Sequence, residues 1–146
     1  MNSSQRLKPI KKLADSREKL AAQSLGKSVE ARRLESERLE QLIVYRNEYL
    51  LTMAQKSEQG MLGDQLHQYH QFLTKLDAAI NQQKNIVQQS EQTLDRSKKD
   101  WKDDNGRATA IDKAIKKLES KESHIKSKKE SNQMDELSTQ AFYGER

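Results

Sequence analysis

The stretch Gln59–Asp64, which reads QGMLGD, is the one strong turn signal in a chain whose other patterns are helical. Two glycines bracket a short connection, and we expect Asp64 to be the N-cap of the segment that follows. A short loop folds two long helices back on each other, so residue i of the first should face residue ~123−i of the second. We therefore expect one domain over 1–146, with a helix at about 6–58, a loop at 59–63, a helix at about 64–138 and a flexible C-terminal tail.

Composition supports an all-α fold made of two long helices, an antiparallel coiled coil whose second helix is longer. The chain has 146 residues, is 34% charged and 33% hydrophobic, and contains one proline and five glycines. Such a composition is typical of long helices that meet along narrow apolar seams. The absence of cysteine excludes disulfide and thiolate chemistry. No apolar run is long enough for a transmembrane helix, and the N-terminus does not have the pattern of a secretory signal.

The second predicted helix carries a regular coiled-coil stripe. Alternating steps of four and three from Leu62 give nineteen positions, of which fourteen are apolar. The positions are Leu62, Leu66, Tyr69, Leu73, Leu76, Ile80, Gln83, Val87, Ser90, Leu94, Ser97, Trp101, Asp104, Ala108, Ile111, Ile115, Leu118, Glu122 and Ile125. Within it, Asn105-Gly106 resembles a turn, but the stripe keeps its phase across it, which favours a continuous helix over a third helix starting near Arg107.

The first predicted helix is less regular. Its apolar residues suggest a seam with a stutter from Leu34 through Arg38 to Leu42, where the supercoil would unwind locally. The seam would consist of Ile10, Leu13, Leu20, Ala31, Leu34, Leu42, Tyr45 and Tyr49. We expect Pro9 in the first helical turn, where its missing N–H costs nothing. Gly26 lies inside this helix and weakens it by about 1 kcal/mol relative to alanine.

The stretch Gln41–Leu50, QLIVYRNEYL, concentrates apolar and aromatic residues in a polar chain. Antiparallel pairing places it against the second helix, so we expect a seam there that braces a partner-binding face. The bracing residues would be Leu42, Tyr45, Tyr49, Leu73 and Ile80, and the face would be Phe72, Leu76, Ala79 and Gln83, which follow steps of four, three and four. In two helices alone Phe72 would lie largely in water, and exposed aromatic surface is typical of a docking site. The alternative is that Phe72 only caps the seam.

The charged residues allow a second docking surface. Antiparallel folding brings two groups of lysines together at the end that carries the termini, and a basic surface suits an acidic partner. These are Lys8, Lys11, Lys12, Lys113, Lys116 and Lys117. Acidic residues interleave with the lysines after Lys113, which disfavours nucleic acid as the partner. His67 and His70 lack further ligands for a metal, and no catalytic motif or cofactor-binding loop is present, so we expect neither enzyme activity nor a cofactor.

Several segments, taken in order, resemble the FliJ family of the bacterial flagellar type III export apparatus. They are LIVYRNEYL in the first helix, YHQFLTKLDAAI and KKDW in the second, and MDEL before the C-terminus. Each segment is weakly specific alone, but together, in this order and with this spacing, the segments cover about residues 7 to 141. The resemblance implies a stalk-like two-helix coil on the cytoplasmic side of the inner membrane at the flagellar base.

The resemblance also implies partners. The end with the termini would enter the hexameric export ATPase, and the export gate protein FlhA would bind the stripe that maps onto Phe72, Leu76, Ala79 and Gln83. The family usually has histidine at the last of these positions. Export chaperones are possible further partners, with flagellar secretion and motility as the outcome. The alternatives are the equivalent stalk of a virulence type III secretion system, an export chaperone, and a nucleic-acid-binding coil.

Overall fold

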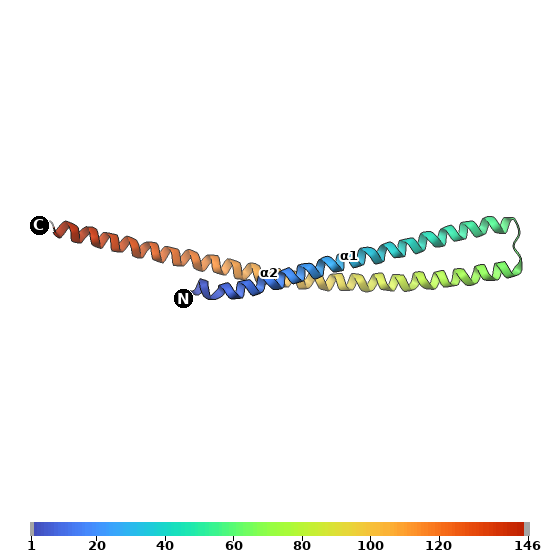
Figure 1. The fold of residues 1–146 in the computed structure, drawn as a ribbon, viewed down its shortest axis with the longest axis horizontal. Helices are drawn as coiled ribbons and strands as arrows, with labels where there is room; N and C mark the ends of the chain where they lie inside the picture. Colours follow the sequence, from blue (N-terminus) through green and yellow to red (C-terminus); the bar gives the residue numbers. More distant parts are fainter. Residues whose placement is uncertain (1, 145–146) are drawn as a thin grey trace. The chain divides into compact units, whose positions relative to one another are not determined.

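The protein is a helical hairpin. A computed structural model describes residues 2–144, and within them the chain forms helix α1 (Ser3–Glu58) and helix α2 (Gly63–Gly144) without any strand (Figure 1). The predicted all-α hairpin with a longer second helix is confirmed. α1 begins slightly before the expected residue 6, and α2 continues to Gly144, through residues that we expected to be a flexible tail.

The chain divides into two compact units. The terminal unit contains the chain up to Leu20 together with the chain from Lys102, and the loop unit spans Ala21–Trp101. In each unit α1 and α2 run antiparallel. Ion pairs report the register: Arg46 to Asp77 at 2.5 Å and Arg32 to Glu91 at 3.4 Å in the loop unit. In the terminal unit Lys11 lies 3.3 Å from Asp112. In all three pairs residue i faces residue 123−i, as the loop position predicts.

Local backbone chemistry explains the reversal at the loop. Gly60 has φ of 93°, a left-handed conformation that glycine adopts without the steric cost of a Cβ. Leu62 is the N-cap of α2: its carbonyl accepts from the Leu66 N–H at 3.1 Å, and its N–H donates to Gln65 Oε1 at 3.3 Å. The expectation that Asp64 is the N-cap is wrong. Asp64 lies inside the first turn, where its negative charge interacts favourably with the positive end of the helix dipole.

The predicted stripe of α2 forms the seam. Every one of its positions from Tyr69 to Glu122 is buried or half-buried. The positions at its two ends are exposed, namely Leu62, Leu66 and Ile125. Leu62 and Leu66 adjoin the loop, and Ile125 lies beyond the start of α1 at Ser3, so no turn of α1 covers it.

The predicted stripe of α1 is largely wrong. Ile10, Leu13, Leu20, Leu34 and Tyr45 are exposed, because α1 turns the neighbouring ridge toward α2. The positions that pack inward follow unbroken steps of three and four, apart from exposed Arg32, so the expected stutter at Arg38 is absent. They are Ser4, Leu7, Lys11, Ala14, Glu18, Ala21, Leu25, Ser28, Glu35, Leu39, Leu42, Arg46, Tyr49 and Met53.

Hydrogen bonds make this half-polar ridge possible. Buried polar groups are tolerated when they are paired, and in residues 2–144 no buried side-chain nitrogen or oxygen lacks a partner. The hydroxyls of Ser28 and Ser97, both buried, lie 2.8 Å apart. Within the described residues, polar layers that join the helices include Ser4–Glu122, Glu18–Asn105, Ser28–Ser97 and Glu35–Gln83. Each layer matches one position of α1 to one of α2 and therefore specifies the register.

Two irregular positions lie inside the helices. α2 is continuous through Asn105 and Gly106, as the phase of its stripe predicts, and Asn105 Nδ2 donates to Glu18 Oε1 at 3.0 Å. The expectation for Pro9 is wrong. α1 already begins at Ser3, capped by Asn2, so Pro9 lies beyond the first turn and leaves the Gln5 carbonyl without its helical donor.

Replacing Gly106 with alanine should raise the free energy of unfolding by about 1 kcal/mol, because glycine is a poor helix former. A Cβ at Gly106 would meet no atom within 4 Å. Urea unfolding followed by circular dichroism at 222 nm measures the change. Gly60→Ala is the matched control: it should lower stability, since a left-handed φ costs an L-residue about 1–2 kcal/mol. An equal effect of both changes would contradict this account.

Candidate partner-binding surfaces

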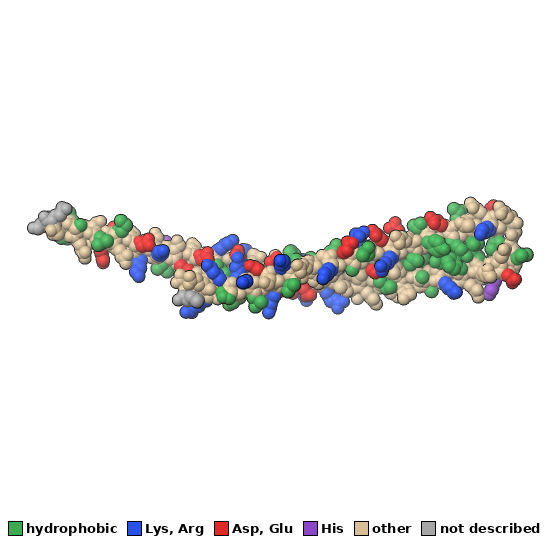
Figure 2. Space-filling view, in the orientation of Figure 1, with side chains coloured by type: hydrophobic (Ala, Val, Ile, Leu, Met, Phe, Trp, Pro, Cys, Tyr) green, Lys and Arg blue, Asp and Glu red, His purple; other side chains and the backbone are tan. Residues whose placement is uncertain are grey.

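An aromatic cluster joins the two helices near the loop. The Tyr49 ring stacks on Tyr69 at 5.5 Å and tilts against Phe72 at 4.7 Å, and Tyr45 meets Phe72 edge-on at 6.3 Å. Figure 2 shows hydrophobic side chains gathered on the visible face near this end of the hairpin. Aromatic pairs in these geometries contribute beyond the area that they bury. The cluster therefore holds the loop end of the hairpin together.

Phe72 is less exposed than the sequence suggested. We expected two helices to leave it largely in water, and this is wrong, because Tyr45 and Tyr49 reach across from α1 and make Phe72 half-buried. Phe72 thus contributes to the hairpin while still presenting part of its surface. The two interpretations given for it, docking site and seam cap, are compatible in this geometry.

The other members of the predicted stripe lie deeper. Leu76 is 7% exposed and Gln83 is 9% exposed, whereas Ala79 is half-buried. Gln83 Nε2 donates to the Glu35 carbonyl at 2.9 Å and to the Glu35 carboxylate at 2.6 Å. In this structure α1 therefore covers Leu76 and Gln83, and the accessible part of the stripe consists of Phe72 and Ala79.

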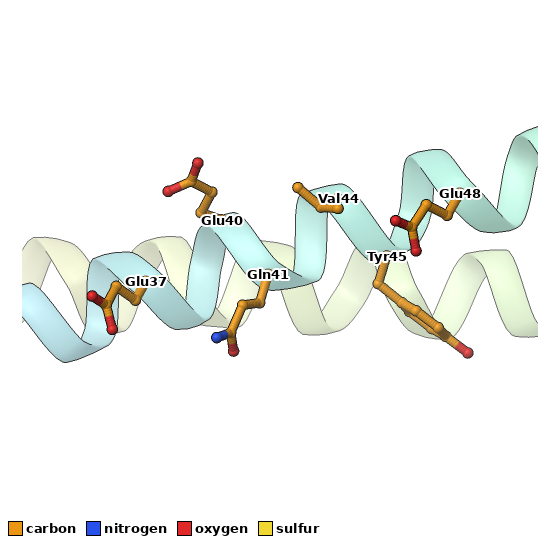
Figure 3. Close-up of a pocket in the computed structure, with 6 residues that line it drawn as sticks. All are labelled: Glu37, Glu40, Gln41, Val44, Tyr45 and Glu48. Atoms are coloured by element: carbon orange, nitrogen blue, oxygen red, sulfur yellow. The ribbon is translucent and has the colours of Figure 1, made fainter.

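A surface groove lies on the outer side of α1 in the loop unit. It has a volume of about 370 Å³, and Figure 3 shows that its lining comes from α1 alone. We call it the acidic groove, and its residues are Glu37, Glu40, Gln41, Val44, Tyr45 and Glu48. Tyr45 is 49% exposed and lies at the edge of the seam, where its ring meets Phe72, whereas Leu42, Tyr49 and Leu73 are half-buried and Ile80 is buried.

The sequence contains a signal for this groove in the stretch that was expected to pack only in the seam. Gln41–Leu50 contains more apolar residues than one seam can bury. Val44 and Tyr45 are among those that remain exposed. Glu40 and Glu48 form no ion pair with any described residue, whereas Arg33 holds Glu37 at 2.5 Å. The groove therefore combines an apolar floor with uncompensated negative charge.

The terminal unit carries the whole net charge of the chain. Counted over the full sequence, it has 16 Lys and Arg against 11 Asp and Glu, which leaves +5, and the loop unit has 11 of each. Lys8 lies 4.0 Å from Glu119, and Asp112 lies 3.3 Å from Lys11 and 3.0 Å from Lys116. Lys12, Lys113 and Lys117 form no ion pair within residues 2–144. Half of the six predicted lysines are thus open to a partner.

Asp112 organises the paired lysines. Hydrogen bonds from Lys116 and then Lys11 lower the pKa of its carboxyl below the ordinary aspartate value. Because the folded pKa is lowered, these contacts stabilise the fold at neutral pH and are lost as the pH falls through that pKa. Asp112 is therefore charged at neutral pH and partly neutralises Lys11 and Lys116.

The described residues contain neither a cluster of metal ligands nor a membrane-spanning stretch. His67 and His70 are exposed, and no group of three or more His, Cys, Asp or Glu in residues 2–144 could hold a metal ion. Neither helix contains a stretch apolar enough to cross a bilayer over this range. The groups that remain for recognition are an aromatic and acidic surface in the loop unit and a basic surface in the terminal unit.

The fold and these surfaces define the class of the protein: an antiparallel two-helix coil whose accessible chemistry is suited to contact with other macromolecules. The chain matches the family model described as "Flagellar FliJ protein" over residues 3–146, nearly its full length, and it belongs to that family. No curated protein matches it. Membership supports a role related to flagellar protein export and is compatible with a non-catalytic protein.

Phe72→Ala should lower the free energy of unfolding by about 2 kcal/mol, because it removes a half-buried aromatic ring from contact with Tyr45 and Tyr49. Thermal and urea unfolding measure the loss. Leu51→Ala is the control, since Leu51 is 64% exposed and its truncation should change stability little. If Phe72→Ala were as mild as Leu51→Ala, Phe72 would not belong to the structural cluster.

Proposed function

We propose that the protein is a non-enzymatic stalk of the flagellar type III export apparatus that binds the hexameric export ATPase and the gate protein FlhA. The observation that carries this proposal is the separation of chemistry between the two units. The terminal unit has the net positive charge, and the loop unit has the aromatic cluster and no net charge. Family membership supports the export context.

The terminal unit is the proposed ATPase-binding end. Lys12, Lys113 and Lys117 can pair with acidic groups of the ring, because none has an intramolecular partner among the described residues. Lys8, Lys11 and Lys116 already form ion pairs with Glu119 and Asp112. They therefore add less uncompensated charge to this surface than the three unpaired lysines do. Electrostatic complementarity of this kind speeds encounter and selects the partner.

The loop unit is the proposed gate-binding end. Phe72 and Ala79 supply the accessible anchor, and Leu76 supports it from the buried side. An aromatic anchor that is already fixed by neighbours loses little conformational entropy on binding. Gln83 has a structural role, because its hydrogen bonds to Glu35 join α2 to α1 beneath the anchor. The family usually has histidine at this position.

The proposal places the protein on the cytoplasmic side of the inner membrane at the flagellar base, with export chaperones as possible further partners and no cofactor. A stalk of a virulence secretion system would use the same two surfaces. An export chaperone is the other alternative, and it would bind cargo instead of bridging two parts of the machine. Loss of swimming on deletion, restored by the gene, separates the flagellar role from the virulence role.

Two sets of variants test the assignment of partners to ends. Phe72→Ala should weaken binding to the FlhA cytoplasmic domain by about tenfold and leave ATPase binding unchanged, because the anchor is lost while the lysines proposed to bind the ATPase belong to the other unit. Replacing Lys12, Lys113 and Lys117 together with glutamate should have the opposite pattern. Affinities are measured by biolayer interferometry below the unfolding transition of each variant. If either variant weakened binding to both partners equally, the separation of the two sites would be contradicted.

A further inference from the structure

The terminal unit has a basic, apolar face that the hairpin does not use. Along α1, Ile10, Leu13 and Leu20 are 50%, 55% and 65% exposed. Lys12 and Lys19 directly precede Leu13 and Leu20 in the sequence, and they line a shallow surface groove of about 350 Å³. Neither lysine forms an ion pair with a described residue. We call these five residues the basic stripe. Its leucines and isoleucine repeat at helical spacing, which is typical of a helix that packs against another helix.

The acidic groove in the loop unit has the complementary chemistry. Val44 and Tyr45 supply exposed apolar surface, at 47% and 49%, and Glu40 and Glu48 supply negative charge that no described cation neutralises. An apolar floor with an acidic rim fits a helix that presents apolar residues beside lysines. The basic stripe is such a helix face, and it belongs to the same sequence.

The spacing of the charges agrees as well. Lys12 and Lys19 are seven residues apart, which is about 10.5 Å along a helix, and Glu40 and Glu48 are eight residues apart, or about 12 Å. Two lysines can therefore meet two glutamates across such a contact. We propose that the basic stripe of one copy docks in the acidic groove of a second copy, so that the protein self-associates.

Charge explains why unlike faces pair. Two basic stripes would repel, because each lies in the unit that holds the net charge of +5, and two acidic grooves would repel through Glu40 and Glu48. Only the contact of stripe with groove brings opposite charges and exposed apolar residues together. Such a contact covers Tyr45, whose ring lies 6.3 Å from that of Phe72. If the proposed gate-binding role holds, self-association would therefore compete with gate binding.

Charge reversal tests the contact. Wild-type protein should show a mass above that of the monomer as concentration rises in low salt, and high salt should return it to monomer. The variant K12E/K19E, with two acidic faces, and the variant E40K/E48K, with two basic faces, should each remain monomeric. Sedimentation equilibrium measures the masses, and circular dichroism verifies that both variants are helical.

Mixing the two variants is the decisive measurement. The intact basic stripe of E40K/E48K can enter the intact acidic groove of K12E/K19E, and the two reversed faces are complementary too, so an equal mixture should associate at least as well as wild type. K84E/K98E, which reverses two exposed lysines elsewhere on α2, should associate like wild type. A monomeric wild type at all concentrations, association that survives either double reversal, or a mixture that stays monomeric would overturn the proposal. FlhA binding plays no part in these measurements, so they stand apart from the proposed function.

Discussion

The whole structure depends on one seam between two helices. A hairpin of two helices has no other interior, so the long apolar stripe of α2 must be covered by α1 alone. The loop around Gly60 sets the register of that contact, and polar layers along it, such as Ser28 with Ser97, join particular residues of the two helices. A shift by one residue would separate these paired groups and leave buried polar atoms without partners, which is costly. The register is therefore specified at several points along the hairpin.

The polar character of the α1 ridge has a consequence for the outside of the molecule. Because Lys11, Glu18, Glu35 and Arg46 occupy seam positions, many apolar side chains of α1 face solvent. They do so near charges of opposite sign in the two units: lysines accompany Leu13 and Leu20, and glutamates accompany Val44 and Tyr45. The residues that could recognise partners are thus the ones that the seam did not use.

The aromatic cluster connects stability to recognition. Phe72 packs against Tyr45 and Tyr49, and the same ring is the accessible part of the proposed gate-binding stripe. Mutations there change the fold and the surface together, so binding data need a stability measurement beside them. The basic surface of the terminal unit differs, because Lys12, Lys113 and Lys117 contact no partner among the described residues and can be changed with little effect on packing.

The sequence by itself determined the hairpin, the register near 123−i, the seam of α2 and the continuity of α2 through Gly106, because these follow from a short loop and a regular apolar repeat. Resemblance in four ordered segments also indicated the family. Only the tertiary structure decided which ridge of α1 faces inward. Hydrophobicity favoured Ile10, Leu13 and Leu34, but α2 presents partners for serine, lysine and glutamate, and pairing across the seam outweighed the apolar pattern of one helix. A side chain's own polarity does not reveal such a partner, so the exposure of Tyr45 and the burial of Gln83 were decided by the contact between helices.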